Sequence, residues 1–125
     1  MPGAILVVDD DPVFRSIARR VLLAAGLLVA GEADSVATAM AMALATRPDA
    51  VMVDVGLPDG DGISLARELR ALPWQPRVVL TSCDPDAARP ADVRWSGAGA
   101  FIAKHELFNA PLERLLTASG DSAVR

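Results

Sequence analysis

The sequence predicts one α/β domain in which a five-stranded parallel sheet is covered by helices on both faces. Five short apolar runs alternate with segments whose apolar residues recur at helical spacing. These runs lack the polar alternation of a strand with one face in water, and strands buried on both faces are typical of parallel sheets. With 125 residues and 52% hydrophobic composition, the chain is long enough for one domain with a substantial core.

The first strand and helix are delimited by local signals. Residues 4–8 form the first expected strand. Asp11 followed by Pro12 predicts a helix with an aspartate N-cap, and Gly26 predicts its end. The helical spacing predicts an apolar face and an opposite basic face, made up respectively of Phe14, Ile17, Ala18, Val21 and Leu22 and of Arg15, Arg19 and Arg20.

The second and third strands are expected at residues 27–30 and 50–55. Between them, Asp34 or Ser35 predicts the N-cap of an alanine-rich helix that extends to about Thr46 and is stopped by a proline. The expected inward stripe of this helix is Val36, Ala39, Met40, Ala43 and Leu44. The third strand carries Asp54 to its end, and a turn-rich loop follows.

A third helix is expected at residues 63–72, with Leu65, Leu69 and Leu72 inward, and a fourth strand at 78–82. Pro90 disfavours helical geometry in the residue before it. We therefore expect a long loop and then a short helix that begins near Pro90 and ends at Gly97 or Gly99.

The last strand is expected at residues 100–103. Asn109 and Pro111 then open a final helix that extends to about Ala118, with three leucines inward. We expect a domain over residues 1–119 and a disordered tail over residues 120–125, where the residues are small and polar.

Composition excludes several classes of protein. The formal net charge of −4 gives no electrostatic footprint for nucleic-acid binding. The one cysteine, Cys83, rules out a disulfide within the chain and favours a reducing, cytoplasmic setting, and we expect it to be a buried or half-buried small residue. The longest apolar run, residues 21–31, is too short to span a bilayer, and the first three residues lack the pattern of a signal peptide.

Chemistry-bearing residues follow four of the five expected strands. The carboxyl ends of parallel strands meet at one edge of a sheet, and ligands bind there where the strand order reverses. This edge is expected to gather Asp9, Asp10, Asp54, Lys104 and a hydroxyl from Thr81 or Ser82. Three close carboxylates repel one another unless a cation is present, and an all-oxygen site with few protein ligands favours Mg²⁺.

The ordered set of motifs resembles a response-regulator receiver domain of two-component signalling, of the kind found in chemotaxis regulators. The resemblance covers residues 5 to about 118. Its first two motifs are the apolar run ending in Asp9-Asp10-Asp11-Pro12 and the pair Val53-Asp54 followed by Leu57-Pro58 and Asp61-Gly62. The other two are a hydroxyl ending the fourth strand and the segment from Gly97 to Lys104. It implies a flavodoxin-like fold with strand order 2-1-3-4-5.

The resemblance also implies roles for these residues. Asp54 resembles the phosphoacceptor, and Asp9 and Asp10 the acidic pair that binds Mg²⁺ together with Asp54 and the backbone carbonyl of Gly56. Lys104 resembles the lysine that pairs with the phosphoacceptor. Ser82, with Thr81 as the alternative, resembles the switch hydroxyl, and Phe101 the aromatic switch residue.

The implied partners are a sensor histidine kinase or a histidine phosphotransfer protein, and an output partner that the sequence does not identify. The implied protein is a cytoplasmic phosphoacceptor with slow autodephosphorylation, not a turnover enzyme. It binds neither nucleic acid nor membrane through this domain and can form a homodimer.

Two features depart from the family pattern. His105 stands where the family often has a cis-proline, and we interpret this histidine as a loop residue, not a ligand. Pro90 interrupts the fourth helix. Two other functions stay open: a receiver-like docking module that needs no phosphorylation, and a small hydrolase with an aspartyl nucleophile, which the lack of a second acid two residues after Asp54 disfavours.

Overall fold

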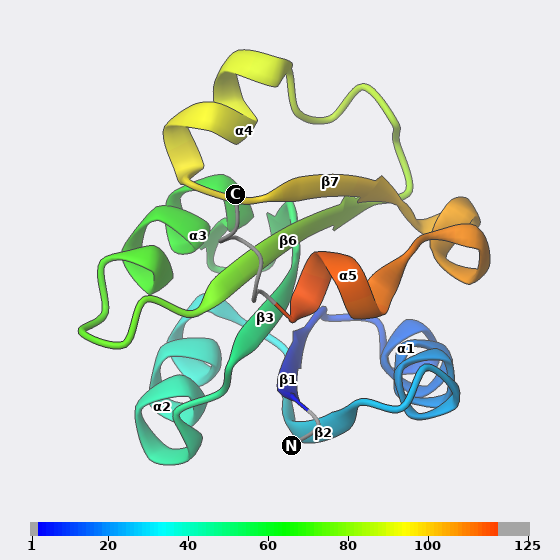
Figure 1. Ribbon diagram of the computed structural model, residues 1–125. Coiled ribbons are helices and arrows are strands. Elements are labelled where there is room, and N and C mark those ends of the chain that lie inside the picture. The colour runs from blue at the N-terminus through cyan, green and yellow to red at the C-terminus, as the bar shows by residue number, and fades with distance from the viewer. Residues whose placement is uncertain (1–2, 118–125) are drawn as a thin grey trace, which may run out of the picture.

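The computed structural model describes residues 3–117, and the predicted sheet is confirmed (Figure 1). Five parallel strands lie in the order β2-β1-β3-β6-β7. In sequence order these strands are β1 (Ala4–Val8), β2 (Leu28–Ala33), β3 (Ala50–Asp54), β6 (Arg77–Ser82) and β7 (Ala100–Ala103). The order 2-1-3-4-5 makes this a flavodoxin-like fold and puts the reversal of strand order between β1 and β3.

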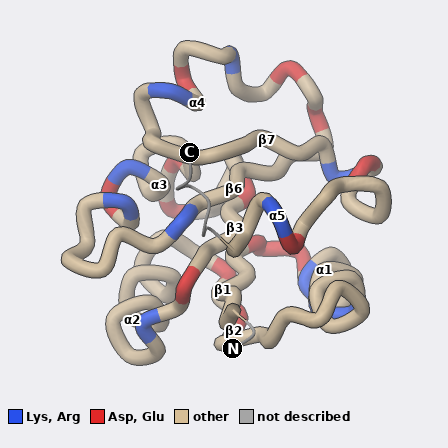
Figure 2. The backbone as a smooth tube through the Cα atoms, viewed as in Figure 1, with Lys and Arg blue, Asp and Glu red and all other residues tan. Residues whose placement is uncertain are grey.

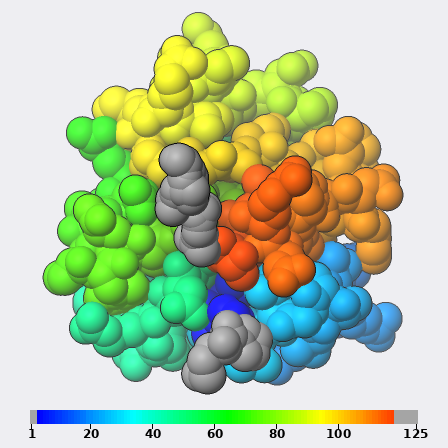
Figure 3. Space-filling model, in the orientation of Figure 1, coloured from blue at the N-terminus to red at the C-terminus, as the bar shows by residue number. Residues whose placement is uncertain are grey.

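Helices cover both faces of the sheet. One face is covered by α1 (Pro12–Ala24) and α5 (Leu112–Leu116), and the other by α2 (Val36–Thr46), α3 (Gly62–Arg70) and α4 (Pro90–Ser96) (Figure 1). The buried residues accordingly form two apolar clusters, one against each face. On the surface, the segment that contains α5 (orange to red) lies between α1 (blue) and α4 (yellow), as Figure 3 shows.

Some predicted boundaries were wrong by several residues. β2 extends to Ala33 because Gly31, Glu32 and Ala33 continue the parallel ladder with β1, although glycine and glutamate gave no strand signal. The third strand ends at Asp54, one residue earlier than expected. The third helix begins at Gly62 and ends at Arg70. The short fourth helix, from Pro90 to a cap at Gly97, is confirmed.

The expected inward stripe of α2 is only partly correct. Ala39 and Ala43 are fully buried, whereas Leu44 is 58% exposed. The helix packs through small side chains, and Leu44 lies on its solvent side. The prediction that Leu44 faces inward was therefore wrong.

Two short elements were not predicted. β4 (Gly56–Leu57) and β5 (Gly60–Asp61) pair as a small hairpin after Asp54, and a 3₁₀ helix, η1, occupies Lys104–Asn109. Within the described residues α5 is therefore only five residues long. The expected helix end at Ala118 and the expected tail at residues 120–125 lie outside the described residues.

The predicted N-caps of α1 and α2 are confirmed, whereas Asn109, expected to open the last helix, is the final residue of η1. The Asp11 side chain accepts a hydrogen bond from Val13 N at 2.9 Å. Ser35, not Asp34, is the N-cap of α2, and it forms a capping box with Thr38. Between residues 3 and 117, no helix combines the length and apolar character needed to cross a membrane.

Asp59 stabilises the start of α2 from a distant loop. Its carboxylate oxygens accept hydrogen bonds from Val36 N at 2.7 Å and from Ala37 N at 3.1 Å. These two backbone hydrogen bonds lower the pKa of Asp59 below its ordinary value of 3.8. The contact joins the loop after β3 to a helix 22 to 23 residues away in sequence, so local sequence signals could not reveal it.

We expect Asp59→Ala to lower the thermal midpoint of unfolding at pH 7, because it leaves two amide groups at the start of α2 without partners. A carboxylate whose pKa is lowered on folding stabilises the protein above its unfolded pKa, and that contribution is lost as pH falls through the folded value. The difference in midpoint between wild type and variant, measured by circular dichroism, should therefore be largest at neutral pH and become smaller below pH 3.8.

Asp86→Ala is the matched control. Asp86 is an exposed aspartate in the loop after β6, and no described residue pairs with its carboxylate. Equal changes in midpoint for the two variants, or a deficit for Asp59→Ala that does not shrink as pH falls, would contradict the capping role of the Asp59 carboxylate.

Candidate functional site

The three predicted carboxylates converge at the carboxyl edge of the sheet. Asp9 and Asp10 follow β1, and Asp54 ends the neighbouring strand β3, whose Val53 pairs with Val8. One carboxylate oxygen from each aspartate lies within 4.8 Å of the others. Asp9 and Asp54 are buried, while Asp10 is exposed. The cluster is therefore open to solvent on the side of Asp10.

Lys104 supplies a cation to this cluster from the end of β7. Its Nζ lies 2.6 Å from Asp9 Oδ2 and 3.7 Å from Asp54 Oδ2. The same ammonium lies 4.4 Å from the centre of the Phe14 ring, which α1 contributes. The sequence predicted a pairing with Asp54, whereas in the structure the closer partner is Asp9.

Burial and neighbouring charges shift the pKa values of both Lys104 and Asp54. Burial lowers the pKa of Lys104, but the hydrogen bond and charge of Asp9, together with the charge of Asp54, outweigh burial and raise it. The pKa of Asp54 is raised from 3.8 to about 6, first by burial and then by the charge of Asp9. Lys104 opposes this rise. Asp54 is thus a carboxylate whose ionised form lacks sufficient positive charge nearby.

Arg15 fixes the backbone of Asp9, a role that the sequence did not indicate. Its guanidinium donates to the Asp9 carbonyl oxygen at 2.6 Å and pairs with Glu32 at 3.1 Å. Arg19 pairs with the other oxygen of Glu32. Helical spacing correctly placed both arginines opposite the apolar face, but the partner, Glu32, lies on the part of β2 beyond the predicted strand.

The loop after Asp54 passes so close to the strand that only glycine fits at position 62. A Cβ atom on Gly62 would lie 2.0 Å from the Asp54 carbonyl oxygen and 2.8 Å from Val55 Cα. The Gly62 amide donates to Val55 O at 2.7 Å. Gly56, by contrast, has open space around it, and its amide hydrogen-bonds to the Asp54 carboxylate. The close approach holds the start of α3 against the backbone of Asp54.

Two hydroxyl groups end β6. Thr81 pairs in register with Asp54 but is fully buried, and its hydroxyl has no hydrogen-bond partner among the described residues. Ser82 is 8% exposed, and its hydroxyl accepts a hydrogen bond from Asp84 N at 3.1 Å. Of the two residues, Ser82 is therefore the less deeply buried.

The neighbouring candidates are placed as follows. Phe101 on β7 is half-buried and borders two cavities, of about 470 and 520 Å³. His105 is exposed, but it lies in the 3₁₀ helix η1 and not in a loop as expected. Cys83 is exposed, so the expectation of burial was wrong: β6 ends at Ser82 and the chain turns out into a loop.

The donor set fits a hard divalent cation. Three carboxylates at this separation offer oxygen ligands. Burial, followed by the charge of Asp9, raises the pKa of Asp54, so a cation bound beside it would favour its ionised form. Asp9, Asp10 and Asp54 could hold Mg²⁺. The acids of the following loop are not available for this purpose, because Asp59 caps α2 and Asp61 caps α3.

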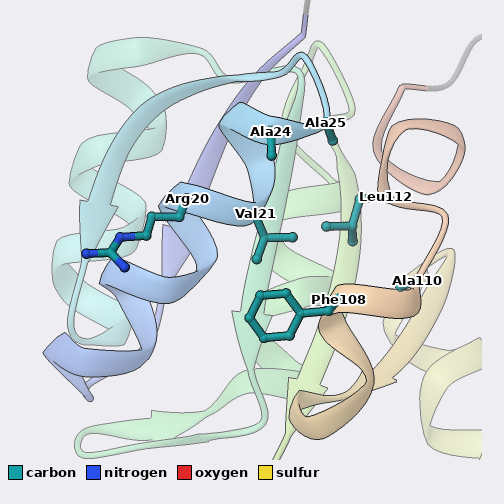
Figure 4. Close-up of a pocket in the computed structure, with 7 residues that line it drawn as sticks. All are labelled: Arg20, Val21, Ala24, Ala25, Phe108, Ala110 and Leu112. Atoms are coloured by element: carbon teal, nitrogen blue, oxygen red, sulfur yellow. The ribbon is translucent and has the colours of Figure 1, made fainter.

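A separate cavity of about 450 Å³ lies between α1 and the segment joining η1 to α5 (Figure 4). Its lining is apolar apart from Arg20, whose side chain points away from the other lining residues, and the ring of Phe108 points toward Val21. None of the acidic residues lines it. The acidic cluster, not this cavity, is therefore the candidate site.

Known proteins are similar to this chain in both sequence and fold. Over residues 5–115 the chain matches the family described as "Response regulator receiver domain". It is 40% identical over 105 residues to the DNA-binding transcriptional activator DevR/DosR of Mycobacterium tuberculosis, covering 83% of this chain and 48% of that protein. It is 31% identical over 104 residues to the chemotaxis protein CheY of Bacillus subtilis, covering 83% of this chain and 87% of that protein.

Among solved structures, the signal receiver domain of the putative response regulator NarL from Mycobacterium tuberculosis matches with a TM-score of 0.74 and 33% identity, covering 89% of this chain and 94% of that chain. The chain spans about half the length of the transcription regulators it matches, for example 49% of a putative transcriptional regulator of Pseudomonas aeruginosa and 51% of BvgA of Bordetella pertussis.

Proposed function

Because the chain belongs to the response regulator receiver domain family of two-component signalling, we propose that Asp54 accepts a phosphoryl group from a histidine kinase or a histidine phosphotransfer protein, and that phosphorylation switches the binding of an output partner. The observation that carries this proposal is the convergence of Asp9, Asp10, Asp54 and Lys104 at one edge of the sheet.

The geometry supports a nucleophilic role for Asp54. A carboxylate oxygen of Asp54 attacks the phosphorus of phosphohistidine in line, so that an O–P bond forms, the N–P bond breaks and the imidazole leaves. Lys104 neutralises charge on the phosphoryl oxygens, and it already lies 3.7 Å from Asp54. Mg²⁺, when held by Asp9, Asp10, Asp54 and the Gly56 carbonyl, would supply the remaining positive charge.

Ser82 is the proposed switch hydroxyl. A phosphoryl group on Asp54 would lie toward solvent at the sheet edge, where Ser82 is 8% exposed and Thr81 is fully buried. Contact with the phosphoryl group would draw Ser82 toward it and strain the hydrogen bond from Asp84 N at the start of the long loop before α4. The hydroxyl is thus able to couple Asp54 to that loop.

Phe101 is the proposed aromatic switch. The ring lies beside a cavity of about 520 Å³ formed with the loop before α4 and with Val93 of α4. Because the ring has space on this side, it can change position without displacing packed atoms. Movement of the loop and of Phe101 would alter the surface offered to a partner.

The remaining properties follow from this role. We propose a cytoplasmic receiver domain over residues 1–119 that undergoes slow autodephosphorylation and is not a turnover enzyme. Output comes through a protein partner, a second copy of this chain or a segment of a longer regulator, and not through nucleic-acid or membrane contacts of this domain.

We expect acetyl phosphate and Mg²⁺ to add one phosphoryl group to the wild-type chain, detected by intact-protein mass spectrometry, and to add none to Asp54→Ala, because the nucleophile has been removed. Asp86→Ala, which removes a loop aspartate outside the cluster, should be labelled like wild type. Undiminished labelling of Asp54→Ala would rule out Asp54 as the acceptor. A wild type that takes up no phosphoryl group would favour a docking module that works without phosphorylation.

A further inference from the structure

A basic cavity lies at the edge of the sheet opposite the acidic cluster. It has a volume of about 360 Å³ and is lined by Arg70, Gln75, Arg77, Val78, Gly97 and Gly99. Arg77 begins β6, the strand that ends at Ser82, so β6 spans the distance between the two sites. In Figure 2 the basic positions on α3 and at the start of β6 (blue) lie away from the acidic run (red) that leads into α1.

The Arg77 side chain has no ion-pair or hydrogen-bond partner within the described part of the chain. It takes part in none of the ion pairs found there. Its Nε is buried and forms no hydrogen bond to any described residue. A buried guanidinium nitrogen without a partner is unfavourable, and guanidinium groups usually meet a carboxylate or phosphate when they are buried. An unpaired arginine that lines a cavity therefore indicates a site for an anion.

Arg70 adds a second guanidinium to the same cavity and is held in place by the loop before β6. Its Nη1 donates to Gln75 O at 3.0 Å and to Pro76 O at 3.4 Å. These contacts use one nitrogen of a group that has five N–H donors. No carboxylate pairs with Arg70 among residues 3–117. The other arginine of α3, Arg67, has a different partner: it donates to Trp95 O and stacks on the Trp95 ring.

Two glycines keep the cavity open. A Cβ atom on Gly99 would lie 3.1 Å from Arg77 Nη1, and one on Gly97 would lie 3.2 Å from Arg70 Cγ. Their amides are already used, since Gly99 N donates to Val78 O and Gly97 N donates to Arg94 O. Recognition in this cavity therefore depends on the two guanidinium groups and the Gln75 side chain.

We propose that this cavity binds a small organic phosphate monoester, whose dianionic phosphoryl group lies between Arg77 and Arg70. Two planar guanidinium groups match the several oxygens of a phosphoryl group better than the two oxygens of one carboxylate. The volume falls in the range of small-molecule sites, about 300–1,000 Å³, and leaves room for a group esterified to the phosphate. Binding here requires neither Mg²⁺ nor phosphorylation of Asp54.

The test is a titration of the ¹⁵N-labelled, Mg²⁺-free 125-residue chain with phenyl phosphate, inorganic phosphate and acetate at constant ionic strength. We expect saturable shifts of the Gly97 and Gly99 amides and of Arg77 Nε. Phenyl phosphate should bind more tightly than inorganic phosphate, and both more tightly than acetate. Shifts that grow linearly without saturating, or acetate that binds as tightly as phenyl phosphate, would overturn the proposal.

Variants locate the binding in the cavity. Arg77→Met keeps an unbranched side chain but removes the charge, and should weaken binding about tenfold or more, as expected for loss of hydrogen bonds to a charged group. Gly99→Ala should also weaken binding, although both guanidinium groups remain. Arg94→Met makes the same charge change at an exposed position on α4 outside the lining.

Arg94→Met should therefore bind phenyl phosphate like wild type. Equal losses for Arg77→Met and Arg94→Met would mean that binding follows overall charge, and the cavity assignment would be wrong. If Arg77→Met does not fold, Arg77→Lys serves instead: it keeps the positive charge but loses the planar fork, and its binding should still be weaker.

Discussion

The Gly62→Ala protein is expected to be less stable than wild type by about 3 kcal/mol, a large value for one added methyl group. The new Cβ would lie 2.0 Å from the Asp54 carbonyl oxygen, 2.8 Å from Val55 Cα and 2.9 Å from the Asp54 carbonyl carbon. All three atoms belong to the backbone, so no side chain can rotate away. The start of α3 must shift, and the hydrogen bond from Gly62 N to Val55 O must lengthen or break.

A loss of stability in Gly62→Ala would indicate the steric clash, because helix propensity alone predicts a gain. Gly62 is the first residue of α3, and glycine-to-alanine changes within helices otherwise stabilise by about 0.5–1 kcal/mol. Urea denaturation measures the difference in the free energy of unfolding. A Gly62→Ala protein as stable as wild type would show that the loop does not press on Asp54.

Gly56→Ala is the matched control in the same loop. Apart from Gly56 itself and its two neighbours in the chain, no residue has a heavy atom within 4 Å of the position that the added Cβ would take. The free energy of unfolding should stay within about 0.5 kcal/mol of wild type. A comparable loss at both glycines would point to general sensitivity of the loop and would contradict the argument from the close approach of Gly62 to Asp54.

The fold could be predicted from sequence because its determinants are local. Asp11-Pro12, Ser35, Pro90 and Gly97 act on their immediate neighbours, and each begins or ends a helix as expected. The errors arose where pairing with another segment overrides local preference. β2 includes Gly31 and Glu32 because β1 lies beside it, and the β4–β5 hairpin depends on the turn geometry after Asp54.

The candidate site could be assembled from topology, but its internal pairing could not. Carboxyl ends of parallel strands meet, so Asp9, Asp54 and Lys104 were expected together. Which aspartate Lys104 contacts more closely depends on side-chain reach, and the structure has Asp9 nearer. The supporting contacts of Arg15 and Asp59 join segments distant in sequence, and no spacing pattern identifies such pairs.

Asp54→Asn is expected to stabilise the Mg²⁺-free protein at pH 7.5 and to leave its stability nearly unchanged at low pH. Burial and the charge of Asp9 raise the pKa of Asp54 from 3.8 to about 6 in the folded protein. At about 1.4 kcal/mol per pKa unit, the ionised Asp54 lowers the free energy of unfolding by at most about 3 kcal/mol. Asparagine keeps the shape of the side chain and removes the charge, so we expect a gain of about 1–3 kcal/mol.

The sign of the pH dependence follows from proton binding. Between pH 3.8 and about 6 the folded protein holds a proton on Asp54 that the unfolded chain releases, so stability falls as pH rises through this window. The difference between Asp54→Asn and wild type should be small below pH 3.8 and should reach its full size above about pH 6. Urea denaturation across this pH range measures the difference in the free energy of unfolding. Asp86→Asn, which changes an exposed aspartate, is the control.

Added Mg²⁺ gives the same prediction a second test. A cation that binds the ionised carboxylates of the folded protein stabilises it in proportion to its occupancy, and wild type offers one more carboxylate than Asp54→Asn. Mg²⁺ should therefore raise the free energy of unfolding of wild type more than that of the variant, and so reduce or reverse the advantage of asparagine at pH 7.5. If Asp54→Asn were less stable than wild type without Mg²⁺, burial and the charge of Asp9 would not disfavour the ionised form of Asp54 in the folded protein.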